Sequence, residues 1–265
     1  MEIRELFGIS KKFVIGMVHC LPLPGTVGYA GDCEKIYAQA VQDALTLEAS
    51  GVDAVIVENM GDGPFSVKLD TAQAVSLAIA TDRVRKAVKI PVGVDAAFCD
   101  HEASLSIAHT TGCQFVRIPV FVDTVEFYGG LITPCARACM TYRKNLNAED
   151  IMVLADIQVK HTNMLLPHVT IEKSAKNAVD CGADAVIVTG SAIGETTPIE
   201  MIERVKKVVK IPVVAGSGVN AQNIDAQLSI ADGAIIGSSL KEGGILSNPI
   251  SGELVRQVLA GLHRG

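Results

Sequence analysis

The chain has 265 residues, 49% of them hydrophobic and 4% aromatic, with no tryptophan and a formal net charge of −6 at pH 7. This composition argues against a nucleic-acid partner, which would need a basic surface and rings that stack on bases. The charged N-terminus has no apolar signal region, and no apolar run is long enough to span a membrane. The seven cysteines are scattered and odd in number, which is typical of a reduced compartment. We therefore expect a cytoplasmic protein.

One unit recurs along the chain: a Val- and Ile-rich run, a loop, a segment of helical periodicity, and then Gly or Pro before the next run. The runs are continuously apolar, which is typical of parallel strands covered by helices on both faces. The length fits one (β/α)₈ domain. We predict a single TIM-barrel domain over residues 1–265, with strands at Phe13–His19, Ala54–Glu58, Val92–Ala96, Phe115–Pro119, Met152–Val159, Ala185–Thr189, Val213–Ala215 and Ala234–Gly237.

Two turns that feed these strands are repeated. The segments 50–54 (SGVDA) and 181–185 (CGADA) are close copies, as are 89–92 (KIPV) and 210–213 (KIPV). Each pair is four units apart, as a half-barrel duplication would give. Convergence on favourable turn chemistry would look similar, because Gly ends a helix well.

The last two strands each run into Gly and Ser, in 213–220 (VVAGSGVN) and 233–241 (GAIIGSSLK). Glycine lets backbone amides approach an anion, and serine adds a hydroxyl donor. Strands 7 and 8 of a TIM barrel form its usual phosphate site. We predict a phosphate-binding cradle made of Gly190, Gly216, Ser217, Gly218, Gly237 and Ser238, in which Gly190 comes from the end of strand 6. Strand 6 ends in Thr189-Gly190-Ser191.

Polar residues at C-terminal strand ends face the catalytic mouth of this fold. A ring of ionisable groups there is costly to bury without a purpose. We predict catalytic roles for His19, Glu58, Asp95, Asp156, Lys160 and His161, and substrate contacts from Asn59, Arg117 and Thr189. With a period of two, Asp156, Gln158 and Lys160 would share one face of strand 5.

Acid–base chemistry by a carboxylate with His161 or Lys160 is the simplest mechanism for this set. Two alternatives stay open: a Schiff base on Lys160, and a divalent metal held by Glu58, Asp95, Asp156 and His19. No cofactor is indicated otherwise. The expected ligand is a small phosphorylated metabolite.

Several loop residues near the predicted mouth are apolar, which would suit a lid or a second subunit. They follow strands 1, 2 and 4, and we expect a homo-oligomer with these residues at or near its interface: Leu21, Leu23, Val27, Met60, Phe65, Phe121 and Val122.

Three motifs resemble the BtpA/SgcQ family: 15–25 (IGMVHCLPLPG), 57–65 (VENMGDGPF) and 155–161 (ADIQVKH). The C-terminal 215–219 (AGSGV), 231–233 (ADG) and 239–241 (SLK) are similar as well. The resemblance covers essentially the whole chain and implies a phosphate-binding TIM barrel. Members carry two labels, a photosystem I biogenesis factor and a candidate nucleosidase or sugar-metabolism enzyme.

The chain departs from the family pattern at the expected substrate end. Asp95 stands where the family tends to have Asn, and an Asp-Gln-Gly loop after strand 4 is replaced by 126–130 (EFYGG). Near the end, an Asn-x-Val-Asp pattern becomes 248–252 (NPISG). The scaffold and phosphate site are thus expected to match the family more closely than the reacting end does.

Overall fold

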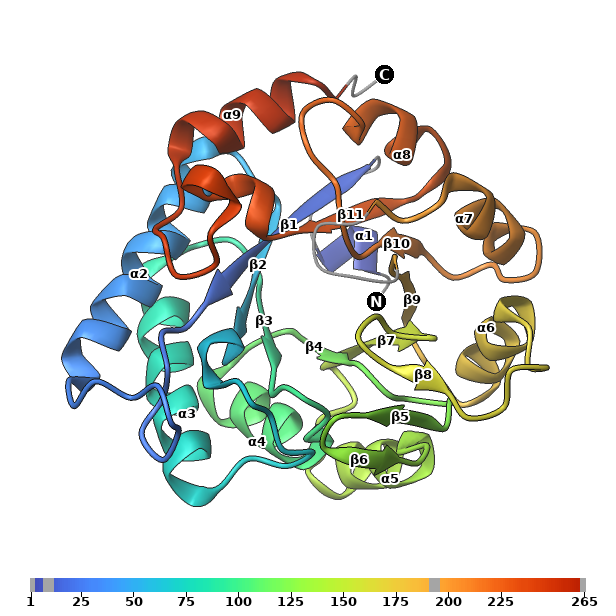
Figure 1. Ribbon diagram of the computed structural model, residues 1–265, viewed down its shortest axis with the longest axis horizontal. Helices are drawn as coiled ribbons and strands as arrows, with labels where there is room; N and C mark the ends of the chain where they lie inside the picture. Colours follow the sequence, from blue (N-terminus) through green and yellow to red (C-terminus); the bar gives the residue numbers. More distant parts are fainter. Residues whose placement is uncertain (1–2, 7–11, 191–195, 263–265) are drawn as a thin grey trace.

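The computed structural model describes residues 3–6, 12–190 and 196–262. Its centre is a closed barrel of eight parallel strands in the order β1-β11-β10-β9-β7-β4-β3-β2 (Figure 1). This confirms the predicted TIM barrel. The bounds agree with the predicted runs to within two residues: β1 Phe13–His19, β2 Ala54–Glu58, β3 Val92–Asp95, β4 Phe115–Ile118, β7 Met152–Ile157, β9 Ala185–Val188, β10 Val213–Ala215 and β11 Gly233–Ile236.

Helices surround the barrel (Figure 1). They are α2 (Cys33–Ser50), α3 (Thr71–Ala87), α4 (His101–Thr111), α5 (Ala136–Asn145), α6 (Ile171–Asp180), α7 (Ile199–Lys206), α8 (Ile224–Ile230) and α9 (Gly252–Ala260). Five of them begin at a side chain that accepts a hydrogen bond from a first-turn amide, which satisfies a donor that the helix leaves free: Asp32, Asp70, Asp100, Thr170 and Ser251.

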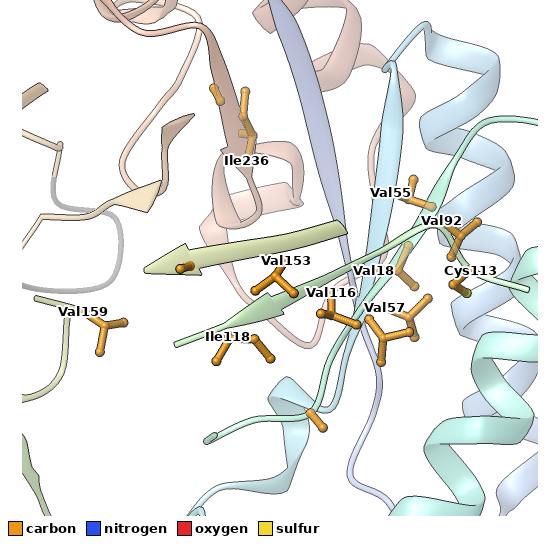
Figure 2. Close-up of a cluster of buried hydrophobic side chains, with 14 of the residues drawn as sticks. Val18, Val55, Val57, Val92, Cys113, Val116, Ile118, Val153, Val159 and Ile236 are labelled. Atoms are coloured by element: carbon orange, nitrogen blue, oxygen red, sulfur yellow. The ribbon is translucent and has the colours of Figure 1, made fainter. Parts of the chain in front are cut away.

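The outward face of the barrel packs against these helices and forms the main core. Val18, Val55, Val92 and Val116 come from β1, β2, β3 and β4 and are all buried in one cluster. Figure 2 shows these valines together with Val57, Ile118 and Val153. β-Branched side chains suit such a surface, because they pack well on a pleated sheet.

The inward face forms a second, separate cluster inside the barrel. Phe13 and Phe115 are its largest members, and each lies over a glycine of a neighbouring strand. A Cβ on Gly233 would come within 2.3 Å of the Phe13 ring, and one on Gly93 within 2.3 Å of the Phe115 ring. Ile3 of the short helix α1 (Ile3–Leu6) closes the same cluster.

One hydrogen-bonding device repeats at every second strand. The residue just before each of these strands exchanges two hydrogen bonds with one residue of the preceding barrel strand. Its side chain accepts from the backbone amide of that residue, and its own backbone amide donates to the carbonyl of that residue. The pairs are Asp53 with Val14, Gln114 with Val92, Asp184 with Val153, and Asp232 with Val213. The similar segments 50–54 and 181–185 therefore make the same bonds, which gives their resemblance a local physical cause.

A second sheet, absent from our prediction, lies outside the barrel. It has three short antiparallel strands in the order β6-β5-β8, at Val125–Phe127 (β5), Gly130–Ile132 (β6) and Asn163–Met164 (β8). The chain between β4 and α5 forms its hairpin, and the loop after β7 adds β8. Three short 3-10 helices, η1 (Met60–Asp62), η2 (Ser238–Leu240) and η3 (Glu242–Gly244), occur in other loops.

We predict that Asp184→Ala destabilises the protein by about 1–2 kcal/mol, because the charged acceptor of the Val153 amide at 2.8 Å is lost. Urea unfolding measures this. Asp180→Ala makes the same substitution at an exposed position, the last residue of α6. It should change the free energy of unfolding by less than about 0.5 kcal/mol. Equal effects of the two variants would show that the repeated turn contributes no stability of its own.

Candidate active site

A polar layer lies above the apolar layers inside the barrel. Alternation along each strand sends every second side chain inward, and in five strands the last inward residue is ionisable. These residues are His19 on β1, Glu58 on β2, Asp95 on β3, Arg117 on β4 and Asp156 on β7. All five are buried, with at most 8% of their surface exposed. The structure thus brings together five of the residues predicted from strand ends.

Within this layer two of the carboxyls each have a close partner, and the third carboxyl has no hydrogen bond in the described part of the chain. Arg117 binds Asp156 with both ends of its guanidinium, Nε to Oδ2 at 2.8 Å and Nη2 to Oδ1 at 2.9 Å. His19 Nε2 lies 3.3 Å from Glu58 Oε2. Asp95 lies 3.7 Å from Arg117 Nε, but neither of its oxygens has a hydrogen-bond partner among the described residues.

The two carboxyls on β2 and β3 are neighbours in register, yet their surroundings push them in opposite directions. Burial, followed by the negative charge of Glu58, raises the pKa of Asp95 well above its ordinary value, although Arg117 opposes this. Burial also raises the pKa of Glu58, but the hydrogen bond from His19 and the charges of His19, Arg117 and Lys160 outweigh it, so this pKa is lowered. Asp95 therefore favours the protonated form and Glu58 the ionised form.

Lys160 and His161 reach the mouth through a loop, not along the strand. β7 ends at Ile157, and both Gln158 (φ 48°) and His161 (φ 64°) have left-handed backbone conformations. The predicted shared face of Asp156, Gln158 and Lys160 is therefore wrong. The Gln158 side chain points away from the lumen and donates to the Val169 carbonyl at 3.0 Å, because the strand alternation stops before it.

Two buried groups hold this loop. The Asp123 carboxylate accepts from the Gln158 amide at 2.7 Å and from the Ser174 hydroxyl at 2.6 Å. The Thr189 hydroxyl accepts from the Lys160 amide at 2.9 Å. Asp123 was missed from the sequence, because nothing in its spacing marks a residue that acts on a loop 35 positions later.

Lys160 is half-buried, and no carboxylate of the described residues lies within ion-pair distance of its amino group. Burial and then the positive charge of Arg117 lower its pKa. The pKa of His161 is lowered by burial and by the Lys160 charge. Asp156 is neutralised by Arg117, so Lys160 does not pair with it.

The predicted cradle lies at the ends of β10 and β11. Gly216, Ser217, Gly218, Gly237 and Ser238 all line the same cleft as the polar layer. The amides of Gly218 and Val219 donate to no described residue, and those of Ser238 and Ser239 begin a 3-10 helix and so lack intrahelical acceptors. These amides and the Ser238 hydroxyl are the donors an anion would find there.

Other parts of the cradle have structural roles. The Ser217 hydroxyl accepts from the Gly190 amide at 2.7 Å, so both groups are already engaged. A Cβ on Gly216 would come within 2.4 Å of Ile187, and one on Gly237 within 2.9 Å of the His19 ring. Close packing inside the barrel thus explains these two glycines without a ligand.

The cleft at the mouth has an empty volume of about 840 Å³, part of it open to solvent. Of the predicted site residues, Asn59, Asp156, Thr189 and Gly190 do not line it. Asn59 is fully buried, and its side chain bonds to Asp62 and to both backbone groups of Ala97. It holds the loop after β3 in place. Ser191 lies outside the described residues.

The sequence prediction missed Phe98, Pro119 and Leu246 in the apolar lining of the cleft, whereas Met60 and Phe65, which it assigned to a lid or an interface, also line it. It also placed two core residues at an interface: Leu23 and Phe121 are fully buried within the chain, so their assignment to an interface was wrong. Met60 and Phe65 line the cleft instead, whereas Val27 is 89% exposed.

The arrangement does not fit the divalent-metal alternative. Among the described residues, no group of three or more His, Cys, Asp and Glu side chains is placed to hold a metal ion. His19 and Arg117 occupy the carboxylates of Glu58 and Asp156, which a metal would need.

Asp95 predicts a pH dependence of stability. Since its pKa is raised from the ordinary 3.8 in the folded state, the unfolded chain loses this proton first, and stability falls as the pH rises above about 4. Asp95→Asn removes that loss. Urea unfolding from pH 4 to 8 should show the variant gaining on the native protein as the pH rises. A constant or shrinking difference would mean that Asp95 is ionised in the fold.

Comparison with known proteins places these features in a family. The chain matches the model of the BtpA family over residues 10–264. A Pyrococcus furiosus protein is 39% identical over 91% of this chain and 91% of its own. The photosystem I biogenesis protein BtpA of Synechocystis is 34% identical over 94% of this chain and 87% of its own.

Solved structures support the fold alone. Tryptophan synthase of Mycobacterium tuberculosis has a TM-score of 0.64 at 16% identity, covering 99% of this chain and 95% of the other. N-(5′-phosphoribosyl)anthranilate isomerase of Pyrococcus furiosus has a TM-score of 0.57 at 13% identity, covering 94% and 98%. No helix in the described part of the chain combines the length and apolar character needed to cross a bilayer. The match to the family model over residues 10–264, together with the relatives at 39% and 34% identity, shows that this chain belongs to the BtpA family.

Proposed function

We propose that the protein is a single-domain enzyme that binds a small phosphorylated metabolite, a sugar phosphate or phosphoribosyl compound, and acts on it by acid–base chemistry. The observation that carries this proposal is that two carboxyls adjacent in register line one cleft in different surroundings. Glu58 lies 3.3 Å from His19, whereas Asp95 has no hydrogen-bond partner among the described residues. The pKa of Asp95 is accordingly raised and that of Glu58 lowered. Carboxyls whose environments separate their pKa values in this way are typical of an acid and a base at one active site.

In this proposal Asp95 donates a proton and the Glu58–His19 pair accepts one. Both carboxyls line the cleft, and His19 orients Glu58 from the neighbouring strand. Lys160 and His161 face the same space, and their lowered pKa values favour the neutral forms needed to accept a proton. This suits a lyase, an isomerase or a nucleosidase-like hydrolase. A Schiff base on Lys160 differs from this proposal in requiring a covalent adduct.

The phosphate end rests on two observations. Four residues that line the cleft at the ends of β10 and β11 have backbone amides without acceptors among the described residues, and backbone amides of this kind are common anion ligands. The structural neighbour whose name contains a phosphoribosyl substrate has the same fold.

A non-catalytic assembly role is the second candidate, because a relative at 34% identity is named as a photosystem I biogenesis protein. The two functions make different demands on the cleft. An assembly factor would tolerate Asp95→Asn, whereas the proposed enzyme would lose its proton donor.

Ser238→Asp should weaken the binding of ribose 5-phosphate at least tenfold. Two like charges about 4 Å apart near a protein surface repel by about 4 kcal/mol at an effective dielectric of about 20, which exceeds the roughly 1.4 kcal/mol of a tenfold change. Isothermal calorimetry measures the affinity. Ser229→Asp adds the same charge on the exposed face of α8 and should leave it unchanged. Equal affinity of both variants and the native protein would remove the phosphate site from this cleft.

We also propose that the protein forms a homo-oligomer through the loop after β1, where a second subunit would cover Val27, which is 89% exposed. Light scattering should give at least twice the chain mass of 27.9 kDa. Val27→Asp should lower it toward that of one chain, since a charge there opposes burial. A native mass of one chain at micromolar concentration would contradict the proposal.

A further inference from the structure

Aromatic residues are scarce in this chain, yet four of them gather on one side of the mouth. Phe65 follows β2, Phe98 follows β3, and Phe127 and Tyr128 come from β5 and its turn. The rings of Phe98 and Phe127 stack with centroids 4.7 Å apart. Phe65 lies 6.5 Å from Phe98, and Tyr128 lies 4.9 Å from Phe127. The Tyr128 hydroxyl accepts from the Phe65 amide at 2.6 Å, which ties the two loops together.

Core packing explains only part of this cluster. Phe127 is 5% exposed and supports Phe98 from behind. Phe65 and Phe98 are half-buried and line the cleft. Their neighbours there are Met60, Ala97 and Pro119, so this side, which we call the aromatic wall (Met60, Phe65, Ala97, Phe98 and Pro119), carries no charge. Ligand pockets are lined mainly by apolar and aromatic side chains, because a ligand that covers them removes apolar surface from water.

The strand order sets where the wall stands relative to the cradle. In the closed ring of eight strands, β3 is four places from β10, and β4 is four places from β11. Phe98 and Pro119, which follow these two strands, therefore face the cradle across the mouth, whereas Met60 and Phe65 follow β2, which is two places from β11. Asp95 lies below Phe98 on β3. A ligand whose phosphate sits on the cradle would extend over the polar layer and end at the wall.

We propose that the ligand carries a neutral planar aromatic or heteroaromatic ring at the end opposite its phosphate, and that this ring packs on Phe65 and Phe98. The inference rests on the proposed phosphate-binding function and names the substrate class. The five wall residues offer no charged partner to a second phosphate or a carboxylate, and burying an unpaired charge against them would be costly. Aromatic side chains instead favour stacked or edge-on contact with another ring.

Calorimetry with ribose 5-phosphate, adenosine 5′-monophosphate and adenosine tests this. The monophosphate has a sugar between its phosphate and a neutral ring, and it should bind at least tenfold more tightly than ribose 5-phosphate. Phe98→Leu, which keeps apolar bulk but no ring, should abolish that gain and leave ribose 5-phosphate affinity within twofold. Phe98→Tyr should retain the gain, and so should Leu131→Ala, a control at an exposed apolar residue of the same three-stranded sheet.

The outcomes separate the two claims. If ribose 5-phosphate binds and the ring adds nothing, the aromatic wall is not a ring site, and the proposed function stands. A different result is that adenosine binds in a Phe98-dependent way, ribose 5-phosphate does not bind, and the monophosphate binds no more tightly than adenosine. This would support the ring site at the aromatic wall and contradict the phosphate site. Absence of any Phe98-dependent binding by adenosine or its monophosphate overturns the inference. Thermal melts of each variant confirm that the barrel is folded.

Discussion

The charge balance of one buried layer constrains the rest of this barrel. Five ionisable side chains point inward near the ends of five neighbouring strands, and each has at most 8% of its surface exposed. Three are carboxyls and one is a guanidinium, so full ionisation would leave uncompensated negative charge. In this layer Arg117 pairs with Asp156, His19 lies beside Glu58, and the surroundings of Asp95 favour its protonated form.

The same layer could exist for structural reasons. Arg117 and Asp156 form a well-made buried pair, and buried pairs of this kind need not serve a reaction. A structural role of this kind does not explain Asp95. A buried carboxyl with no hydrogen-bond partner among the described residues destabilises a fold, and an apolar side chain of similar size would pack there more favourably. A functional role explains the presence of Asp95 at the edge of a cleft more simply than a structural role does.

The cleft combines three surfaces of different chemistry. The cradle at β10 and β11 offers amides, the polar layer offers proton donors and acceptors, and the aromatic wall offers uncharged rings. The cradle comes from the ends of β10 and β11, whereas the polar layer and the aromatic wall share β2, β3 and β4, with the layer on the strands and the wall in the loops that follow them. Such a division is typical of TIM barrels, in which the strands fix positions and the loops select the ligand. The extra sheet β6-β5-β8 extends this principle, since it supports Phe98 and Tyr128.

The sequence by itself determined the barrel, its eight strands and the inward-facing residues His19, Glu58, Asp95, Arg117 and Asp156. This worked because continuous apolar runs and strand alternation are local properties that one stretch of chain reveals. Where alternation ended, prediction failed: Gln158 turned away from the lumen after β7 stopped at Ile157.

Only the tertiary structure decided which polar residues pair, which carboxyl has no hydrogen-bond partner among the described residues, and which residues line the cleft. The sequence could not show that Asn59 and Thr189 support loops, or that Leu23 and Phe121 belong to the core. It also gave no sign that Phe65 and Phe98, from two loops, converge with Phe127 of β5. Pairing, burial and convergence depend on distances between residues far apart in the chain, and the closure of the barrel alone sets those distances.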